Sequence, residues 1–266
     1  MKQFILCIAL ITIAASIQAQ NNQRVIEVKV SGQGEPLLFI PGFTVPGDIW
    51  EPFVKQLEQD FECHVITLAG FGGKTPIDFP WLPQVNSALQ NYIIANNLSN
   101  VTIIGHSLGG TIATWLASRD SLNLRQIILV DALPASGALM IPNFNPDNLV
   151  YESPFNSQQL NMTDEEFAQM AAGMSRGMSL NTSSQEQIKK WMVNADRKTY
   201  VYGYTDYLKL DLRKDLKSIN IPVTIIAADT PYGKDMVTKT YQSQYANLKT
   251  YDFILAENAA HFIMLD

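Results

Sequence analysis

One serine of this chain lies in a pattern that is typical of a nucleophile. Ser107 is the middle residue of the pentapeptide GHSLG at residues 105–109, which directly follows the apolar run at residues 101–104. A helical pattern begins at Leu108 and continues with apolar residues at one-turn spacing. A Gly-x-Ser-x-Gly sequence between a strand and a helix forms a sharp turn, which holds the serine hydroxyl in an exposed position. Such a serine can attack a carbonyl carbon.

A serine hydroxyl becomes a good nucleophile when a base removes its proton, and histidine is the usual base. The chain contains three histidines. His106 lies inside the turn and is assigned a structural role, and His64 begins a predicted strand as a packed residue. His261 is the one histidine that comes after Ser107 in the sequence, and it follows the last predicted strand. Elimination therefore selects His261 as the base.

The imidazole of the base needs a carboxylate that orients it, and two aspartates qualify. Asp131 follows the apolar segment at residues 126–130, and Asp229 follows the segment at residues 221–228. The carboxyl end of a sheet strand is the place where such an acid is found in this arrangement. The residues alone leave Asp131 and Asp229 open as alternatives.

Attack on a carbonyl also requires two N–H donors that stabilise the negative oxygen. The residue after the nucleophile supplies one donor, which predicts the backbone N–H of Leu108. The loop after the strand at residues 37–40 supplies the other, and Phe43 in the sequence PGF at residues 41–43 is the candidate. The glycine of this loop permits the tight turn that the donor needs.

Strand and helix patterns alternate along the parts of the chain that would position these residues. The predicted strands are residues 24–30, 37–40, 63–68, 101–104, 126–130, 221–228 and 249–255. The predicted helices, besides the one that follows Ser107, are residues 48–59, 84–96 and 234–245. The alternation predicts an α/β fold, with a mostly parallel, doubly wound sheet that helices cover on both faces.

Helical patterns fill the long segment between residues 133 and 207, where no strand pattern occurs. Thr163 and Glu166 have the spacing of a capping box, and Ser183 and Glu186 repeat that spacing. The segment interrupts the core between two strands, at the edge of the sheet where α/β proteins bind ligands. We expect residues 133–207 to form a helical cap or lid on a core made of residues 20–132 and 208–266.

The first residues have the pattern of a targeting segment. Lys2 precedes an apolar stretch at residues 4–15, and small and polar residues follow as far as Gln20. The pattern predicts a signal peptide at residues 1–19, export to the bacterial periplasm or the medium, and no stable insertion in a membrane after cleavage. Cys63 would be the single cysteine of the mature chain, so we expect no intramolecular disulfide.

Composition and spacing exclude several classes of function. The chain is 47% apolar and 17% charged, as is ordinary for a folded globular protein, and its net charge of −6 argues against nucleic acid as a partner. Neither a CxxC pair nor paired histidines indicate a metal site. The glycine-rich residues 70–73 do not form the Gly-x-Gly-x-x-Gly pattern of a dinucleotide site. We therefore expect a small-molecule partner and no cofactor.

Taken together, these motifs resemble the α/β-hydrolase fold superfamily over the chain after Gln23. The residues that carry the resemblance are 41–43 (PGF), 69–73 (AGFGG), 105–109 (GHSLG), 130–134 (VDALP) and 260–264 (AHFIM). The resemblance implies a serine hydrolase with a helical cap. Members with the common acid place it two residues beyond Asp229, where this chain has Pro231, and other members place it after the preceding strand. The resemblance therefore favours Asp131 over Asp229.

Two further departures from the superfamily pattern bear on the site and on the sheet. Many members begin the oxyanion loop with His-Gly, and this chain has Pro41-Gly42, which leaves backbone donation possible. Members also continue past the histidine with a long helix over one face of the sheet, whereas this sequence stops at Asp266. Either the sequence is a piece of a longer protein, or that face is covered in another way.

The expected function is hydrolysis of a small to medium carboxylic ester or a related acyl substrate. Ser107, His261 and Asp131 would form the triad, and the reaction would pass through an acyl-enzyme. Two alternatives stay open because one fold serves many functions. The same triad supports carbon–carbon bond hydrolysis or perhydrolysis, and the fold also occurs in non-catalytic ligand-binding proteins. Dehalogenation is disfavoured, because the dehalogenases of this superfamily have an aspartate where this chain has Ser107.

Overall fold

A computed structural model describes residues 24–119 and 121–266 of the chain, and the predicted signal peptide at residues 1–19 lies outside these residues. The described residues form one seven-stranded sheet in the order β1-β3-β2-β4-β5-β6-β7. The strands are β1 Ile26–Ser31, β2 Glu35–Ile40, β3 Phe61–Leu68, β4 Val101–His106, β5 Leu124–Val130, β6 Val223–Ala228 and β7 Asp252–Ala256. Each predicted strand is present.

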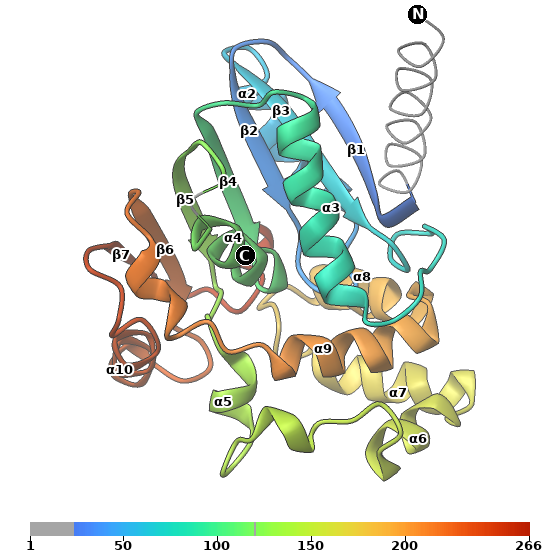
Figure 1. The fold of residues 1–266 in the computed structure, drawn as a ribbon. Helices are drawn as coiled ribbons and strands as arrows, with labels where there is room; N and C mark the ends of the chain where they lie inside the picture. Colours follow the sequence, from blue (N-terminus) through green and yellow to red (C-terminus); the bar gives the residue numbers. More distant parts are fainter. Residues whose placement is uncertain (1–23, 120) are drawn as a thin grey trace, which may run out of the picture.

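Strand direction in this sheet follows the prediction. β1 runs antiparallel to β3, and the other neighbouring pairs are parallel. The prediction of a mostly parallel, doubly wound sheet is therefore confirmed. The parallel strands end at a common edge, towards the bottom of Figure 1. Residues that follow β2, β4, β5, β6 and β7 in the sequence are brought to this edge.

Helices lie on both faces of the sheet, because alternate strand residues are apolar on both sides. The helices of one face are α3 (Trp81–Ala95), α4 (Leu108–Ala117) and α10 (Lys234–Gln244), and those of the other are the 3₁₀ helix η1 (Gly47–Trp50) and α2 (Glu51–Leu57). Leu38 belongs to the core of the first face, whereas its neighbours Leu37 and Phe39 belong to the core of the second. This period of two is the one expected for a strand that is buried on both sides.

The chain between β5 and β6 is helical, as predicted, and we call this group of helices the helical insert. Its members are α5 (Ser136–Met140), η2 (Pro146–Asn148), α6 (Pro154–Leu160), α7 (Asp164–Ser175), α8 (Thr182–Asn194), the π-helix η3 (Thr199–Gly203) and α9 (Tyr204–Lys209). The short η4 (Asp215–Ser218) follows before β6. The insert lies beneath the carboxyl ends of the strands, in light green to orange in Figure 1.

The two predicted capping boxes of the insert have different outcomes. Thr163 and Glu166 form the reciprocal hydrogen bonds of a capping box at the start of α7. The second box is wrong, because α8 begins earlier. The side chain of Asn181 caps α8 by accepting a hydrogen bond from the backbone N–H of Ser183, at 2.9 Å.

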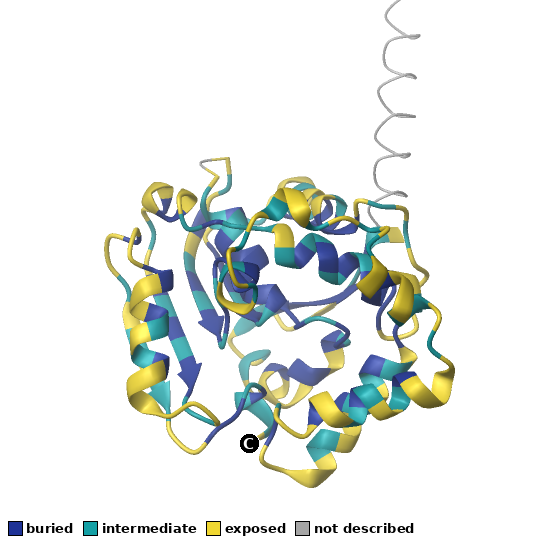
Figure 2. Cartoon of the chain, turned by 90° about the horizontal axis from the view of Figure 1, so that it is seen from below, coloured by how far each residue is buried: buried dark blue, intermediate teal, exposed yellow. Residues whose placement is uncertain are grey.

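Apolar packing and one carboxylate fix the insert to the core. Phe167 and Ile188 of the insert share a buried cluster with Phe39 of β2. Asp206 of α9 accepts a hydrogen bond from the backbone N–H of Trp81 at 2.6 Å, and so satisfies a free donor at the start of α3. Figure 2 shows the resulting pattern, in which the inner strands and inner helix faces are mostly buried and the outer helix faces are exposed.

The second face of the sheet is covered only in part by the residues that the structure describes. The half-buried side chains of Ile104, Ile128 and Ile226, together with Trp50 of η1, line a groove of about 590 Å³ on this face. The 3₁₀ helix η5 (Ile263–Leu265) contributes Ile263 to its wall. Across residues 24–119 and 121–266, none of the helices is long and apolar enough to cross a membrane.

Candidate active site

Ser107 occupies the tight turn between β4 and α4. Its backbone angles, φ 52° and ψ −120°, are unfavourable for a residue with a side chain. The turn brings the strand and helix backbones into contact: a Cβ on Gly105 would lie 2.3 Å from the carbonyl oxygen of Gly109, and a Cβ on Gly109 would lie 2.2 Å from that of Ile40. Glycine at both positions therefore allows the strained turn to form.

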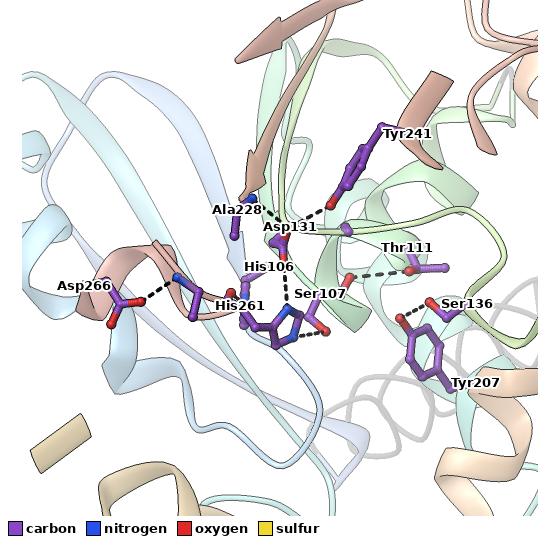
Figure 3. A network of polar contacts seen from close by, with 12 residues as sticks. His106, Ser107, Thr111, Asp131, Ser136, Tyr207, Ala228, Tyr241, His261 and Asp266 are labelled. Carbon is purple, nitrogen blue, oxygen red and sulfur yellow. Dashed lines mark hydrogen bonds and ion pairs between the residues drawn. The ribbon is translucent and has the colours of Figure 1, made fainter. Parts of the chain in front are cut away.

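His261, in the loop after β7, lies between Ser107 and Asp131 (Figure 3). Its Nε2 is 3.0 Å from the Oγ of Ser107, and its Nδ1 is 2.7 Å from Oδ2 of Asp131. The first hydrogen bond joins two residues that lie 154 positions apart in the sequence, and the second joins two that lie 130 positions apart. The fold thus brings three of the predicted site residues together in one chain of hydrogen bonds.

The carboxylate of Asp131 is held by two further donors. Its Oδ1 accepts hydrogen bonds from the backbone N–H of Ala228 at 3.0 Å and from the hydroxyl of Tyr241 at 2.8 Å. Burial raises the pKa of Asp131, but the hydrogen bond and charge of His261 and these two donors outweigh burial and leave the pKa below its ordinary value. Asp131 is therefore ionised, and Oδ2 accepts the Nδ1–H of His261.

Asp229, the alternative acid, occupies a different place. The hydroxyl of Thr230 donates to its Oδ1 at 3.0 Å. Burial acts to raise the pKa of Asp229, while hydrogen bonds from Thr230 and from the backbones of Asn258 and Ala259 lower it by more. Among the residues described, no hydrogen bond joins Asp229 to His261. Asp229 thus contacts the loop that precedes His261, and Asp131 contacts the imidazole.

The loop that carries the predicted oxyanion donor lies against the nucleophile. A Cβ on Gly42 would lie 3.4 Å from the Cβ of Ser107, and a Cβ on Gly109 would lie 2.6 Å from the carbonyl oxygen of Pro41. Phe43 follows Gly42 in this loop, and Leu108 is the first residue of α4. The two backbones that carry the predicted donors therefore meet at Ser107.

The ring of Phe43 is surrounded by aromatic side chains of the core and the insert. The ring centroids of Phe71 and Tyr204 lie 4.9 and 5.3 Å from that of Phe43, and those of Tyr200 and Trp81 lie at 5.7 and 6.2 Å. Burial raises the pKa of Tyr200 to about 12, so this tyrosine is neutral at neutral pH. The wall beside the oxyanion loop is therefore aromatic and uncharged.

Two tyrosines near the site were not found from the sequence. Tyr241 of α10 contacts Asp131, and Tyr207 of α9 places its hydroxyl 2.6 Å from the Oγ of Ser136, beside Ser107 (Figure 3). Burial raises the pKa of Tyr207, and interactions with the hydroxyls of Ser136 and Ser107 act against burial. In the sequence these tyrosines lie on apolar helix faces, where they are indistinguishable from ordinary core residues.

The other two histidines are buried. His64 of β3 lies away from the site and places its Nδ1 2.7 Å from the hydroxyl of Tyr92. His106 has no exposed surface, and its Nε2 lies 2.9 Å from the carbonyl oxygen of His261. Both histidines therefore pack in the core, and His106 does so in contact with the loop that carries His261.

Comparisons with known proteins show which family the chain matches. The sequence profile of the alpha/beta hydrolase family matches residues 37–266. The pimeloyl-[acyl-carrier protein] methyl ester esterase of Vibrio cholerae is 26% identical over 200 residues, which cover 73% of this chain and 75% of that protein. The N-formylmaleamate deformylase of Pseudomonas putida is 24% identical over 225 residues, covering 81% and 78%. An esterase from Exiguobacterium antarcticum has a similar structure, with a TM-score of 0.73, 18% identity and coverage of 91% and 90%.

These relatives correct the prediction of export. The Vibrio cholerae relative is named for an ester that is attached to an acyl-carrier protein. That substrate does not fit a protein of the periplasm or the medium, so the predicted export is wrong and the signal peptide at residues 1–19 is not supported.

Proposed function

Because the chain belongs to the alpha/beta hydrolase family and is a hydrolase, we propose which reaction it catalyses. It hydrolyses a small to medium, uncharged carboxylic ester, with Ser107 as the nucleophile. One observation carries the proposal: His261 is hydrogen-bonded both to the hydroxyl of Ser107, at 3.0 Å, and to the carboxylate of Asp131, at 2.7 Å. A hydroxyl, an imidazole and a carboxylate in this order are the groups that acyl transfer requires.

The first half of the reaction forms an acyl-enzyme. The Oγ of Ser107 attacks the carbonyl carbon of the ester as its proton passes to Nε2 of His261. The backbone N–H groups of Leu108 and Phe43 stabilise the oxygen that becomes negative. His261 then gives its proton to the oxygen of the departing alcohol. Asp131 keeps the other proton of the imidazole on Nδ1 and stabilises the imidazolium.

The second half releases the acid. A water molecule attacks the acyl carbon while His261 removes its proton, and the bond to Ser107 breaks as the proton returns to Oγ. The products are a carboxylic acid, an alcohol and the free enzyme. No group beyond the residues named here is needed for either half.

An uncharged acyl group is supported by the surroundings of Phe43. The side chains around this ring are aromatic, and two basic residues of the insert are engaged elsewhere. Arg197 pairs with Asp164 at 3.0 Å and lies over the ring of Phe167, and Lys198 lies over the ring of Phe79. A free carboxylate on the acyl chain would therefore find Arg197 already paired with a carboxylate and Lys198 already placed over an aromatic ring.

We propose that the helical insert acts as the lid of this site. Tyr200 and Tyr204 of the insert contact Phe43, so the insert contributes to the wall beside the reacting atoms. Closing an acyl pocket in this way excludes water from the ester and sets the length of the acyl chain that fits.

Active-site labelling tests the proposal. A fluorophosphonate probe reacts with an activated serine, and mass spectrometry of the labelled protein identifies the residue. We expect labelling at Ser107 and hydrolysis of a series of p-nitrophenyl esters with a preference for short acyl chains. The variant S107A should lose both reactions. A folded S107A protein that hydrolyses the esters at the wild-type rate excludes the mechanism, and absence of labelling in the wild type favours a ligand-binding function.

A further inference from the structure

His106 is a buried titratable residue for which the proposed reaction has no use. It is the last residue of β4, and its side chain has no exposed surface. The centroid of its ring lies 4.7 Å from that of His261 and 4.7 Å from that of Phe262. A polar side chain in such a position is expected to have partners for its polar atoms, because burial without them is unfavourable.

One nitrogen of His106 has a partner in the loop that carries the proposed base. Nε2 of His106 lies 2.9 Å from the carbonyl oxygen of His261 (Figure 3). A carbonyl oxygen accepts and does not donate, so Nε2 carries the proton and donates this hydrogen bond. Burial lowers the pKa of His106 to about 3, and the ring is therefore neutral with its proton on Nε2 at neutral pH.

The other nitrogen has no such partner. Nδ1 of His106 is buried without a hydrogen bond in the part of the chain that the structure describes. It faces the oxyanion loop, where a Cβ on Gly42 would lie 2.7 Å away. A buried polar atom without a partner destabilises the folded state, and an apolar side chain of similar volume would avoid that loss. Packing alone therefore does not explain a histidine at position 106, whereas the bond to His261 does.

The loop of His261 is held on its other side by the insert. The backbone N–H of Phe262 donates to the carbonyl oxygen of Met178 at 2.8 Å. The carboxylate of Asp266 accepts from the backbone N–H of Ala260 at 2.7 Å and from that of Leu180 at 2.9 Å. The backbone of His261 thus lies between contacts to the insert on one side and the bond from His106 on the other.

We propose that His106 is a positioning residue, whose Nε2–H holds the carbonyl oxygen of His261 and so keeps the imidazole of His261 in line with Ser107 and Asp131. The inference rests on the proposed function, because positioning matters only where His261 acts as the base. His106 itself touches neither the substrate nor the transferred proton.

Two substitutions separate this role from packing. H106L removes the donor at similar volume, and H106Q retains an amide N–H that can reach the same carbonyl oxygen. Loss of alignment in a catalytic group costs on the order of 10- to 100-fold in rate. We therefore expect H106L to lower kcat for p-nitrophenyl acetate by about that factor while KM changes less than about 3-fold. Labelling by fluorophosphonate should slow by the same factor, and H106Q should recover most of both rates.

A matched control is available in His64, which is also buried in the core and lies away from the site. H64L should leave kcat and the labelling rate unchanged, and melting temperatures measured for all variants report folding. The proposal is overturned if folded H106L retains wild-type rates, or if folded H106Q is as slow as H106L. If H106L does not fold, the rate of folded H106Q decides: recovery of most of the wild-type rate supports the proposal, and a slow folded H106Q overturns it. If neither folds, His106 acts in stability, and the positioning role is excluded.

Imidazole ¹⁵N NMR of the wild-type protein keeps this test separate from that of the proposed function. A proton on Nε2 of His106 that persists at neutral pH supports the bond to His261, whether or not the protein hydrolyses esters. A proton on Nδ1 of His106 overturns the inference even in an active enzyme. Failure of the wild type to hydrolyse or to be labelled counts against the proposed function instead.

Discussion

Replacing Asp131 by asparagine should reverse the tautomer of the proposed base. Two donors, the N–H of Ala228 and the hydroxyl of Tyr241, face Oδ1 of Asp131 at 3.0 and 2.8 Å. In D131N these donors keep the amide oxygen on their side, so the NH₂ group faces Nδ1 of His261. Nδ1 must then accept, and the ring proton moves to Nε2. An Nε2–H cannot remove the proton from Ser107.

The size of the effect follows from the loss of the base. A histidine held in the wrong tautomer lowers kcat by on the order of 10⁴-fold in serine hydrolysis. This corresponds to about 5.4 kcal/mol of transition-state stabilisation at about 1.36 kcal/mol for each factor of ten. D229N is the matched control, because Asp229 contacts Thr230 and not the imidazole. We expect D229N to keep kcat within about 5-fold of the wild type, since no reacting group is misaligned.

The assay is hydrolysis of p-nitrophenyl acetate at saturating ester, with fluorophosphonate labelling as a second readout that does not depend on the alcohol. Circular dichroism melting curves establish that each variant is folded. A folded D131N enzyme within about tenfold of the wild-type kcat refutes the tautomer argument. A loss confined to D229N assigns the acid to Asp229.

Three further predictions concern stability and the insert. The pKa of His106 is about 3 in the folded protein, below its ordinary value of about 6.5. Between these two pH values, His106 therefore binds a proton in the unfolded chain and not in the folded one. The free energy of unfolding of the wild type, measured with urea, should therefore fall as pH drops from 6.5 to 4. In H106L the dependence of this free energy on pH should be smaller by roughly 1.4 kcal/mol per pH unit; an equal pH dependence in both proteins would contradict the burial argument. G109A should lose more than about 2 kcal/mol in the same assay, because the new Cβ would lie 2.2 Å from the carbonyl oxygen of Ile40; wild-type stability would show that this contact relaxes freely. D206A removes the acceptor of the Trp81 N–H, so we expect faster proteolysis of the insert and a higher KM at little-changed kcat; unchanged proteolysis would mean that apolar packing alone anchors the insert.

Local patterns made much of the fold predictable. Most strands are short apolar runs bounded by turn residues, β1 alternates apolar with polar residues, and the turn at Ser107 is specified by adjacent residues in the sequence. His261 could be selected because the chain has few histidines and one of them follows the last strand. In each case the information lies in the sequence pattern itself, so it could be read without knowledge of the tertiary structure.

Contacts between distant residues account for what could not be predicted. The residues alone leave Asp131 and Asp229 open, because the path of the loop after β7 decides which of them meets the imidazole and no local pattern specifies that path. The preference for Asp131 comes from the resemblance to the superfamily. The contact of Tyr241 with Asp131 spans 110 positions. The start of α8 is a different kind of failure, because Asn181 and Ser183 are both good caps and the sequence does not rank them.

The strained backbone of Ser107 carries information about selection. A serine at φ 52° and ψ −120° raises the free energy of the folded state by on the order of 1–3 kcal/mol, whereas glycine adopts such angles freely. A lineage that used this fold only to bind a ligand would gain stability by drifting to glycine at position 107, with nothing lost. Under the proposed function, a serine at this position exchanges stability of the fold for reactivity, as expected where activity and stability compete.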